Sequence, residues 1–253
     1  MRNLIYRVYE GRLGRQLSGA ALPKHVGVIL DGNRRWAERK PGATTREGHA
    51  AGAAKIFEFM GWCDDLGIDV VTLYLLSTNN LTGRKSAELD ELLQIIADLA
   101  TRFATEGRWR IKWVGDATGL DPKLVAALKD AERKTKHMTG LHINLAVGYG
   151  GRKEIADAMR AIVQKHAKKG ASLEVLAEAL TPELISKHLY TGGQPDPDLV
   201  IRTSGEQRIS DFLLWQSAHS EFYFEEALWP DFRRVDFLRA LRAFARRHRR
   251  FGA

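Results

Sequence analysis

Residues 25–37 read HVGVILDGNRRWA, and this stretch decides the fold and points to a site. An apolar run with the composition of a buried strand stops at Asp31, and a Gly-Asn-Arg-Arg run follows at once. Ligands of open α/β sheets bind outside the carboxyl ends of the strands. Arginines and backbone N–H groups beside a glycine hold phosphates, and a neighbouring carboxylate binds a cation such as Mg²⁺. The stretch therefore predicts an anion and metal site. The alternative is an aspartate that caps a helix beside solvated arginines.

The composition is that of an ordinary globular protein. The chain has 253 residues, of which 44% are hydrophobic and 28% charged, enough for one large α/β domain or two small ones. No apolar run is long enough to cross a bilayer, and charged residues interrupt the N-terminal apolar residues, which argues against a signal peptide. The single cysteine, Cys63, excludes an internal disulfide and a cysteine-based zinc site. We therefore expect a cytoplasmic protein.

The chain is basic, with a net charge of +8, and residues 233–250 contain eight arginines against one acid. Binding to nucleic acid is one alternative function for such a face. However, the apolar residues of this segment recur at helical spacing, which favours a docked terminal helix with its arginines in solvent. Because no zinc-finger, RNA-recognition or helix-turn-helix pattern is found, we predict no nucleic-acid partner.

Apolar runs alternate with helical patterns along the chain, which predicts a single-domain α/β fold with a parallel sheet surrounded by helices. Strands are expected at residues 26–30, 70–76, 111–114, 142–147, 199–202 and 212–215. Helices are expected at residues 48–66, 87–104, 122–136, 153–168, 173–179, 183–189 and 235–248. Residues 1–24 are expected to form an amphipathic helical extension, and residues 25–253 a single α/β domain.

The loops after the second and fourth predicted strands are polar or rich in glycine. Ser77, Thr78, Asn79 and Asn80 form a run of small polar side chains that can bind a phosphate or position a proton acceptor. A simple polar turn has the same composition. Residues 148–152 read GYGGR, a spacing that differs from the dinucleotide fingerprint GxGxxG and so disfavours a nicotinamide cofactor.

A second arginine site is predicted after the strand at 199–202. Arg202, Arg208 and Ser210 place two guanidinium groups and a hydroxyl around an anion. Glu221 follows the last predicted strand and offers a second carboxylate. Two arginine sites and two carboxylates at strand ends predict a metal-assisted reaction between two phosphorylated substrates.

Several motifs occur in the order seen in the cis-prenyltransferases, the family of undecaprenyl diphosphate synthase. They are HVGVILDGNRRWA, Gly48-His49, LYLLSTNNL, NLAVGYGGRKEI, DLVIRTSGEQRIS and FLLWQSAHSEFYFEEALWPDF. The chain resembles this family from His25 to its C-terminus. The resemblance implies a parallel sheet wrapped by helices, a hydrophobic product tunnel, a homodimer, and Mg²⁺-dependent condensation of isopentenyl diphosphate with an allylic diphosphate.

The resemblance also implies a role for each residue of the motifs. Asp31 and Glu221 would bind Mg²⁺. The residues that would hold or adjoin the allylic diphosphate are Gly32, Asn33, Arg34, Arg35, Trp36, Arg46 and His49. Those that would hold isopentenyl diphosphate are Arg202, Arg208, Ile209 and Ser210, together with Arg250 and Gly252 of an Arg-x-Gly ending that reaches across the dimer.

The loop after the second strand would complete the substrate site with Ser77, Thr78, Asn79, Asn80, Leu81 and Arg84. Asn80 is the position that the family treats as proton acceptor, with Ser77 nearby. An amide is a poor base, so we expect a diphosphate oxygen, or a water held by Ser77 and Asn80, to take the proton.

Product length is expected to depend on Leu75 and Leu76. In the family a small residue two positions before Ser77 opens the tunnel, and a bulky one shortens the product. Leu75 occupies that position here, and a branched side chain in a close-packed wall leaves little room for extension. Arg34 and Leu81 also resemble shorter-chain members. We therefore expect a short product such as (2Z,6E)-farnesyl diphosphate, made from geranyl diphosphate.

Three alternatives stay open. Leu75 could be an ordinary core residue, in which case the product would be a decaprenyl or undecaprenyl diphosphate. A non-catalytic prenyltransferase-like subunit would have lost Asp31 or the arginines, which are intact here. The apolar residues and arginines of residues 1–17 suit a docked helix or a peripheral membrane contact.

Overall fold

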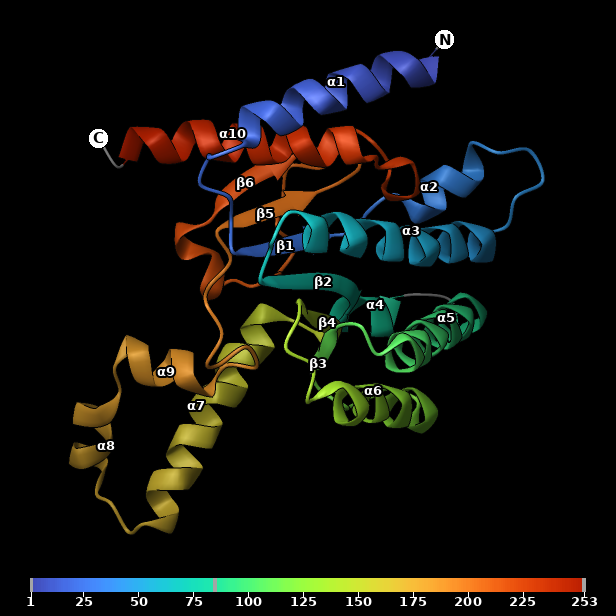
Figure 1. Ribbon diagram of the computed structural model, residues 1–253. Helices are drawn as coiled ribbons and strands as arrows, with labels where there is room; N and C mark the ends of the chain where they lie inside the picture. Colours follow the sequence, from blue (N-terminus) through green and yellow to red (C-terminus); the bar gives the residue numbers. More distant parts are fainter. Residues whose placement is uncertain (1, 84–85, 252–253) are drawn as a thin grey trace.

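Six parallel strands form the sheet that carries the site, in the spatial order β3-β4-β2-β1-β5-β6 (Figure 1). The computed structural model describes residues 2–83 and 86–251. The strands are β1 (His25–Ile29), β2 (Val70–Ser77), β3 (Arg110–Val114), β4 (His142–Tyr149), β5 (Leu199–Arg202) and β6 (Glu221–Phe224). The parallel α/β sheet predicted from the sequence is confirmed.

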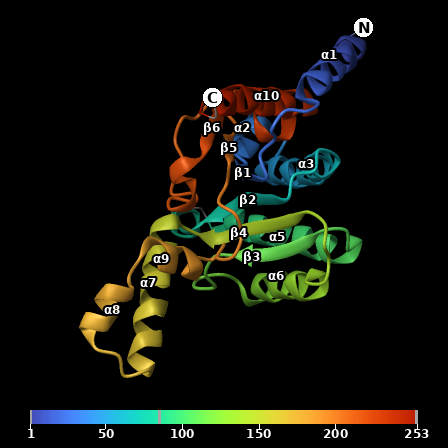
Figure 2. The same ribbon diagram turned by 60° about the vertical axis from the view of Figure 1, so that its left-hand side comes forward.

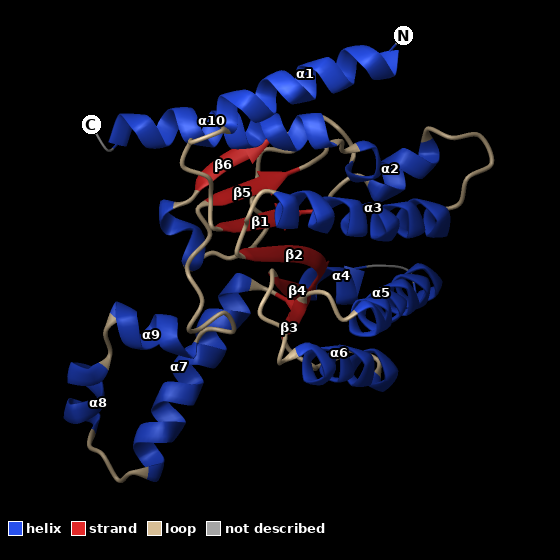
Figure 3. Ribbon diagram, viewed as in Figure 1, coloured by secondary structure: helices blue, strands red, loops and turns tan. Residues whose placement is uncertain are grey.

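Helices cover the sheet, and one group of them projects away from it (Figures 2 and 3). The α-helices are α1 (Arg2–Leu17), α2 (Asn33–Glu38), α3 (Thr45–Asp65), α4 (Thr78–Gly83), α5 (Ser86–Glu106), α6 (Pro122–Thr135), α7 (Gly151–Lys168), α8 (Leu173–Ala179), α9 (Pro182–His188) and α10 (Arg234–Phe251). Two short 3₁₀ helices, η1 (Gln216–His219) and η2 (Trp229–Asp231), flank β6. Helices α7, α8 and α9 form the projecting arm.

The main core lies between the sheet and helices α3, α5, α6 and α10. Val28 and Leu73 of the central strands are fully buried in it. Phe59 of α3 packs edge-on against Trp229 and Phe237, with ring centroids 5.6 and 4.8 Å apart. Strands covered by helices must be apolar on both faces, which is why they appear as nearly continuous apolar runs in the sequence.

The first and last helices of the chain lie together on one side of the sheet. Helix α1 packs on α10 (Figure 1), and Leu13 and Leu17 are buried in the main core. Leu238 and Leu241 of α10 are buried as well, as the apolar spacing of this segment predicts. In the described part of the chain, no helix is long and apolar enough to cross a membrane.

The sixth strand was predicted at the wrong place. Residues 212–215 form no strand, and Leu213 there has a positive φ of +47°. Phe212 and Leu213 are nevertheless fully buried, in a cluster that includes Val200 and Tyr149. An apolar run indicates that a segment is buried, but burial alone does not distinguish a strand from an irregular buried segment. The sixth strand is β6, Glu221–Phe224.

Candidate active site

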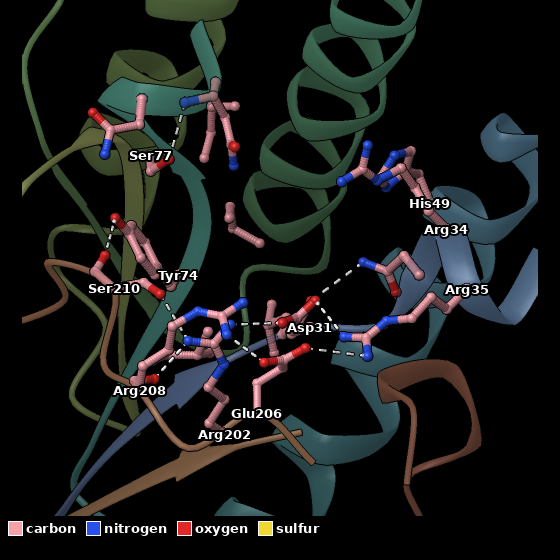
Figure 4. A pocket seen from close by; sticks show the side chains of 18 of the residues that line it. Asp31, Arg34, Arg35, His49, Tyr74, Ser77, Arg202, Glu206, Arg208 and Ser210 are labelled. Carbon is pink, nitrogen blue, oxygen red and sulfur yellow. Dashed lines mark hydrogen bonds and ion pairs between the residues drawn. The ribbon is translucent and has the colours of Figure 1, made fainter. Parts of the chain in front are cut away.

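A cavity of about 800 Å³ opens at the carboxyl ends of the central strands (Figure 4). Its lining includes Asp31 after β1, Ser77 at the end of β2, and Arg202 at the end of β5. The predicted site residues that it brings together are Asp31, Gly32, Asn33, Arg34, Arg35, His49, Leu75, Leu76, Ser77, Asn79, Asn80, Arg202, Arg208 and Ser210. Both predicted arginine groups therefore face one cavity.

Asp31 lies between the two arginine groups. Its Oδ2 is 2.7 Å from Nη2 of Arg202, and its Oδ1 is 3.4 Å from Nη2 of Arg35. Burial raises the pKa of Asp31, but the hydrogen bond and charge of Arg202, with the charge of Arg35, outweigh this effect and hold the pKa below its ordinary value. The carboxylate is therefore ionised at neutral pH.

Arg202 organises the second arginine group from within the protein. Its side chain is only 5% exposed, and Nη1 donates to the Ser210 hydroxyl at 2.7 Å and to the Arg208 carbonyl. The Arg208 side chain is 62% exposed and pairs with Glu206. One guanidinium is thus fixed at the floor of the cavity, while the other extends into it from an exposed loop.

Helix α2 carries the first arginine group and is held in place by glycines. Gly32 precedes the helix with a φ of +110°, and a Cβ atom there would lie 2.8 Å from Cδ2 of Leu228. At Gly48 of α3, a Cβ atom would lie 2.3 Å from the carbonyl oxygen of Asn33. These close approaches require glycine. Arg35 then donates to Ser204 Oγ at 2.6 Å.

Glu88 of α5 lies close to two residues of the cavity lining. Its Oε1 lies 3.7 Å from Nε2 of His49 and 3.9 Å from Nη1 of Arg34. His49 is buried, whereas the Arg34 side chain is 58% exposed. Arg34 can therefore turn from Glu88 toward an anion in the cavity.

The end of β2 supplies a polar rim and an apolar wall. The Asn80 backbone N–H donates to Ser77 Oγ at 3.1 Å. Leu75 and Leu76 line the cavity below them, and Leu76 is almost fully buried. The Tyr74 hydroxyl donates to the Ser210 carbonyl at 3.2 Å and so joins this strand to the second arginine group.

Several predicted residues lie elsewhere. The Trp36 indole N–H donates to Asp231 at 2.8 Å, and Lys40 lies over the ring. Arg46 is exposed on the first turn of α3. The remaining predicted residues outside the cavity lining are Thr78, Leu81 and Ile209. Arg84, Gly252 and the side chain of Arg250 lie outside the described residues.

The placement of Glu221 is wrong for a metal site shared with Asp31 in one chain. Glu221 is the first residue of β6 and pairs in register with Leu199, the first residue of β5. It therefore lies at the amino end of the sheet, whereas Asp31 lies at the carboxyl end. Its Oε2 is 2.7 Å from Nη1 of Arg247. The strand-end position expected for Glu221 followed from the misplaced sixth strand, whereas the Mg²⁺ role that the family resemblance implies for this residue stays a prediction.

Three polar residues of the cavity were not predicted: Glu38, Tyr74 and Glu206. Glu206 pairs with Arg35 at 3.5 Å and with Arg208, so it joins the two arginine groups. Its place within TSGEQRIS, two residues before Arg208, was a usable signal. Tyr74 sits in an apolar strand run, which hides its role.

Asp31 is suited to a metal ion that is bound together with substrate. Within residues 2–83 and 86–251, no group of three or more His, Cys, Asp and Glu side chains could form a metal site. Mg²⁺ is commonly held by one or two carboxylates together with substrate phosphates. An ionised carboxylate that faces a cavity lined with arginines fits this arrangement.

Comparison with known proteins decides the family. The model of the family described as "Putative undecaprenyl diphosphate synthase" matches residues 29–252. The chain belongs to this family. It is a cis-prenyltransferase, as its motifs predict, and both arginine groups lie within the matched region.

Close relatives and a solved structure agree with this assignment. The chain is 55% identical to "Isoprenyl transferase 1" of Streptomyces avermitilis, over all of this chain and 97% of that protein. It is 56% identical to the "(2Z,6E)-farnesyl diphosphate synthase" of Thermobifida fusca, over 98% of this chain and 97% of that protein. A crystal structure of lavandulyl diphosphate synthase from Lavandula x intermedia, in complex with dimethylallyl diphosphate, is 35% identical and superposes with a TM-score of 0.81. That match covers 88% of this chain and 95% of the plant chain.

Proposed function

We propose that this cis-prenyltransferase condenses isopentenyl diphosphate with geranyl diphosphate to give (2Z,6E)-farnesyl diphosphate and diphosphate. The observation that carries the proposal is one cavity with Arg34 and Arg35 on one side of Asp31, and Arg202 and Arg208 on the other. Two separate groups of guanidinium forks suit two diphosphates held at the same time. The name of the Thermobifida fusca relative supports this product.

Each arginine group is assigned to one substrate. Arg34 and Arg35 on α2 would bind the diphosphate of the allylic substrate. Arg202 and Arg208, with the Ser210 hydroxyl, would bind that of isopentenyl diphosphate. The short apolar wall of Leu75 and its neighbours would hold the hydrocarbon chain.

Asp31 would hold Mg²⁺ together with the diphosphates. When bound, the ion neutralises charge on the departing diphosphate. Arg35 and Arg202 keep the pKa of Asp31 low, so the carboxylate is available as a ligand over the whole neutral range. Arg35, which lies beside the carboxylate on the allylic side, would stabilise the charge that develops on the leaving oxygen.

The reaction joins C4 of isopentenyl diphosphate to C1 of the allylic substrate. The bond between C1 and oxygen breaks, and the diphosphate leaves with the electron pair. One proton is then lost from C2 of the isopentenyl unit. The Asn80 N–H orients the Ser77 hydroxyl. Since an amide is a poor base, we assign the proton to a diphosphate oxygen, or to a water that Ser77 and Asn80 hold.

The apolar part of the cavity supports a short product. Its aliphatic lining consists of Ile29, Leu30, Leu75 and Leu76. The two leucines of β2 are branched and lie in a close-packed wall, which limits extension of the chain beyond them. The relative from Thermobifida fusca is named a (2Z,6E)-farnesyl diphosphate synthase, and a relative from Mycobacterium bovis is named a short-chain Z-isoprenyl diphosphate synthase.

Product analysis tests the proposal. Purified protein is offered dimethylallyl, geranyl and farnesyl diphosphates separately, with radiolabelled isopentenyl diphosphate, and the products are separated by chain length. We expect a C15 product from geranyl diphosphate. A decaprenyl or longer main product would refute the short-chain proposal, and no product from any primer would favour a non-catalytic subunit.

The oligomeric state and the cellular location of the protein are still predictions. We propose a homodimer in which the Arg-x-Gly ending of one chain reaches the isopentenyl diphosphate site of its partner. Light scattering of the purified protein tests the dimer, and a monomer at working concentration would refute it. Cytoplasmic location and peripheral membrane contact of the N-terminal helix are tested by cell fractionation.

A further inference from the structure

The loop of residues 203–214 carries the second arginine group and has a strained backbone. Ser210 and Asp211 have positive φ angles of +49° and +67°. L-residues rarely adopt this conformation, so the surrounding structure must hold it in place. At this turn the chain passes from Arg208 and Ser210, which line the cavity, to the fully buried Phe212.

Tyr74 supports the 203–214 loop on its sheet side. The Phe212 ring stacks on the Tyr74 ring, with centroids 4.8 Å apart and an interplanar angle of 19°. The Tyr74 hydroxyl also donates to the Ser210 carbonyl (Figure 4). The buried end of the loop and its cavity end therefore rest on the same side chain.

Asp211 supports the 203–214 loop on the other side by capping α7. Its carbonyl accepts the Gly151 N–H at 2.8 Å, and its Oδ1 accepts the Arg152 N–H at 3.0 Å. The first N–H groups of a helix have no partner within the helix. Gly150, which precedes α7, has no side chain that could bond to them. Asp211 supplies these bonds from a distant part of the sequence.

Two glycines make this contact possible. A Cβ atom at Gly150 would lie 2.8 Å from Oδ2 of Asp211 and 2.8 Å from Oγ1 of Thr78. A Cβ atom at Gly151 would lie 2.9 Å from the Asp211 carbonyl oxygen. The GYGGR run, which has the wrong spacing for a dinucleotide site, is thus explained by close packing against the 203–214 loop.

We propose that Asp211 is a positioning residue: its cap on α7 fixes the 203–214 loop and thereby places Arg208 and Ser210 for isopentenyl diphosphate. The inference rests on the proposed function, which assigns this substrate to that group. Arg202 holds the Ser210 hydroxyl from the floor of the cavity, so loss of the side-chain bond from Asp211 to Arg152 N–H lets the turn move relative to Arg202. The allylic group lies on α2, and Arg35 touches the loop only at Ser204 and Glu206, five or more residues before the Asp211 cap, so we expect the allylic group to depend on the cap much less.

Steady-state kinetics with both substrates varied test the inference, using Asp211→Gly and Asp211→Asn. Glycine adopts the positive φ without strain and removes only the side chain. We expect Asp211→Gly to raise KM for isopentenyl diphosphate about tenfold, the factor produced by loss of a charge-assisted hydrogen bond of about 1.4 kcal/mol. KM for geranyl diphosphate should change less than about twofold. Asparagine tolerates positive φ and keeps an acceptor oxygen, so Asp211→Asn should restore most of the affinity.

Asp121→Ala is the matched control. Asp121 caps α6 in the same way, with its Oδ1 accepting the Lys123 N–H at 2.6 Å, and it is exposed outside the cavity lining. We expect a lower Tm and no change in either KM. The positioning role would be overturned if Asp211→Gly changed both KM values equally or changed neither. It would also be overturned if Asp211→Asn did not restore the KM for isopentenyl diphosphate.

Turnover by the unaltered protein separates the two proposals. Absence of turnover refutes the proposed function. Calorimetric titration with isopentenyl diphosphate then still tests the role of Asp211. This role would be overturned if Asp211→Gly and the unaltered protein had the same Kd. It would also be overturned if the unaltered protein did not bind isopentenyl diphosphate.

Discussion

Replacement of Asp31 by asparagine separates the two tasks of this residue, cation binding and pairing with arginine. The change removes the ionic partner that lies 2.7 Å from the buried guanidinium of Arg202. Removing one partner of a fully buried pair costs about 3–5 kcal/mol. The Asp31 side chain is 30% exposed, and asparagine keeps an acceptor oxygen, so we expect the free energy of unfolding to fall by about 2 kcal/mol.

The matched control is Asp64→Asn. The Asp64 side chain is 31% exposed and lies 2.6 Å from Arg108, but that arginine is 55% exposed. An ion pair between exposed groups contributes only about 0–1 kcal/mol. Thermal unfolding should therefore show a Tm lower by about 4–8 °C for Asp31→Asn and by less than about 4 °C for Asp64→Asn.

The difference in free energy of unfolding between the unaltered protein and Asp31→Asn should depend on pH with a definite sign. Because the pKa of Asp31 is lowered in the folded protein, its stabilising effect is complete above the ordinary carboxyl pKa, about 4, and is lost as the pH falls through the lowered value. The difference between the unaltered protein and Asp31→Asn should therefore be constant near neutral pH and shrink in acid. A difference that grows as the pH falls would refute the ion-pair argument.

Activity and ligand binding complete this test. We expect Asp31→Asn to slow Mg²⁺-dependent turnover by about 1,000-fold, since the metal supplies several kcal/mol of charge stabilisation. Without metal, inorganic diphosphate should bind Asp31→Asn more tightly than the unaltered protein, because a competing carboxylate is gone. Weaker metal-free binding, or turnover within tenfold of normal, would show that Asp31 acts differently.

Three further changes test the cavity, the site helix and the metal. Leu75→Ala should lengthen the main product by at least one isoprene unit in chromatography of radiolabelled products, and an unchanged product would place the limit elsewhere. Gly48→Ala should lower the free energy of unfolding by about 2 kcal/mol, because its Cβ would lie 2.3 Å from the Asn33 carbonyl oxygen. On the same helix, a Cβ atom at Gly61 would meet nothing within 4 Å, so Gly61→Ala should be neutral or stabilising by up to about 1 kcal/mol. Equal effects of Gly48→Ala and Gly61→Ala on urea unfolding would contradict the packing argument. EDTA should abolish turnover and leave the Tm of the substrate-free protein unchanged, because the described residues form no protein-only metal cage.

The sequence predicts the floor of the site well because parallel strands impose a simple rule. Ser77 and Arg202 end their strands and Asp31 lies two residues after β1, and the three strands are neighbours, so these side chains meet at one edge of the sheet. Each of these strands is buried and therefore apolar, and this makes its end easy to find.

The rest of the site depends on contacts between distant segments. Phe212 and Leu213 are as apolar as a strand because they fill the core, and this placed Glu221 at the wrong end of the sheet. Helix α2 is too short for a periodic pattern, and its position comes from the close approach of Gly48 to Asn33. Such steric constraints become visible only in three dimensions.

The placement of β1 has a consequence for how the chain is synthesised. This early strand lies at the centre of the sheet, between β2 and β5, and Val26 pairs with Leu199. A ribosome has made most of the chain before β5 emerges, and α10, on which α1 packs, emerges later still. Pairings between residues so far apart are slow to form, and an unpaired central edge exposes the nascent chain to aggregation. The anion site therefore comes into existence only near the end of translation, and a chain that stops before β5 has neither a complete sheet nor Arg202.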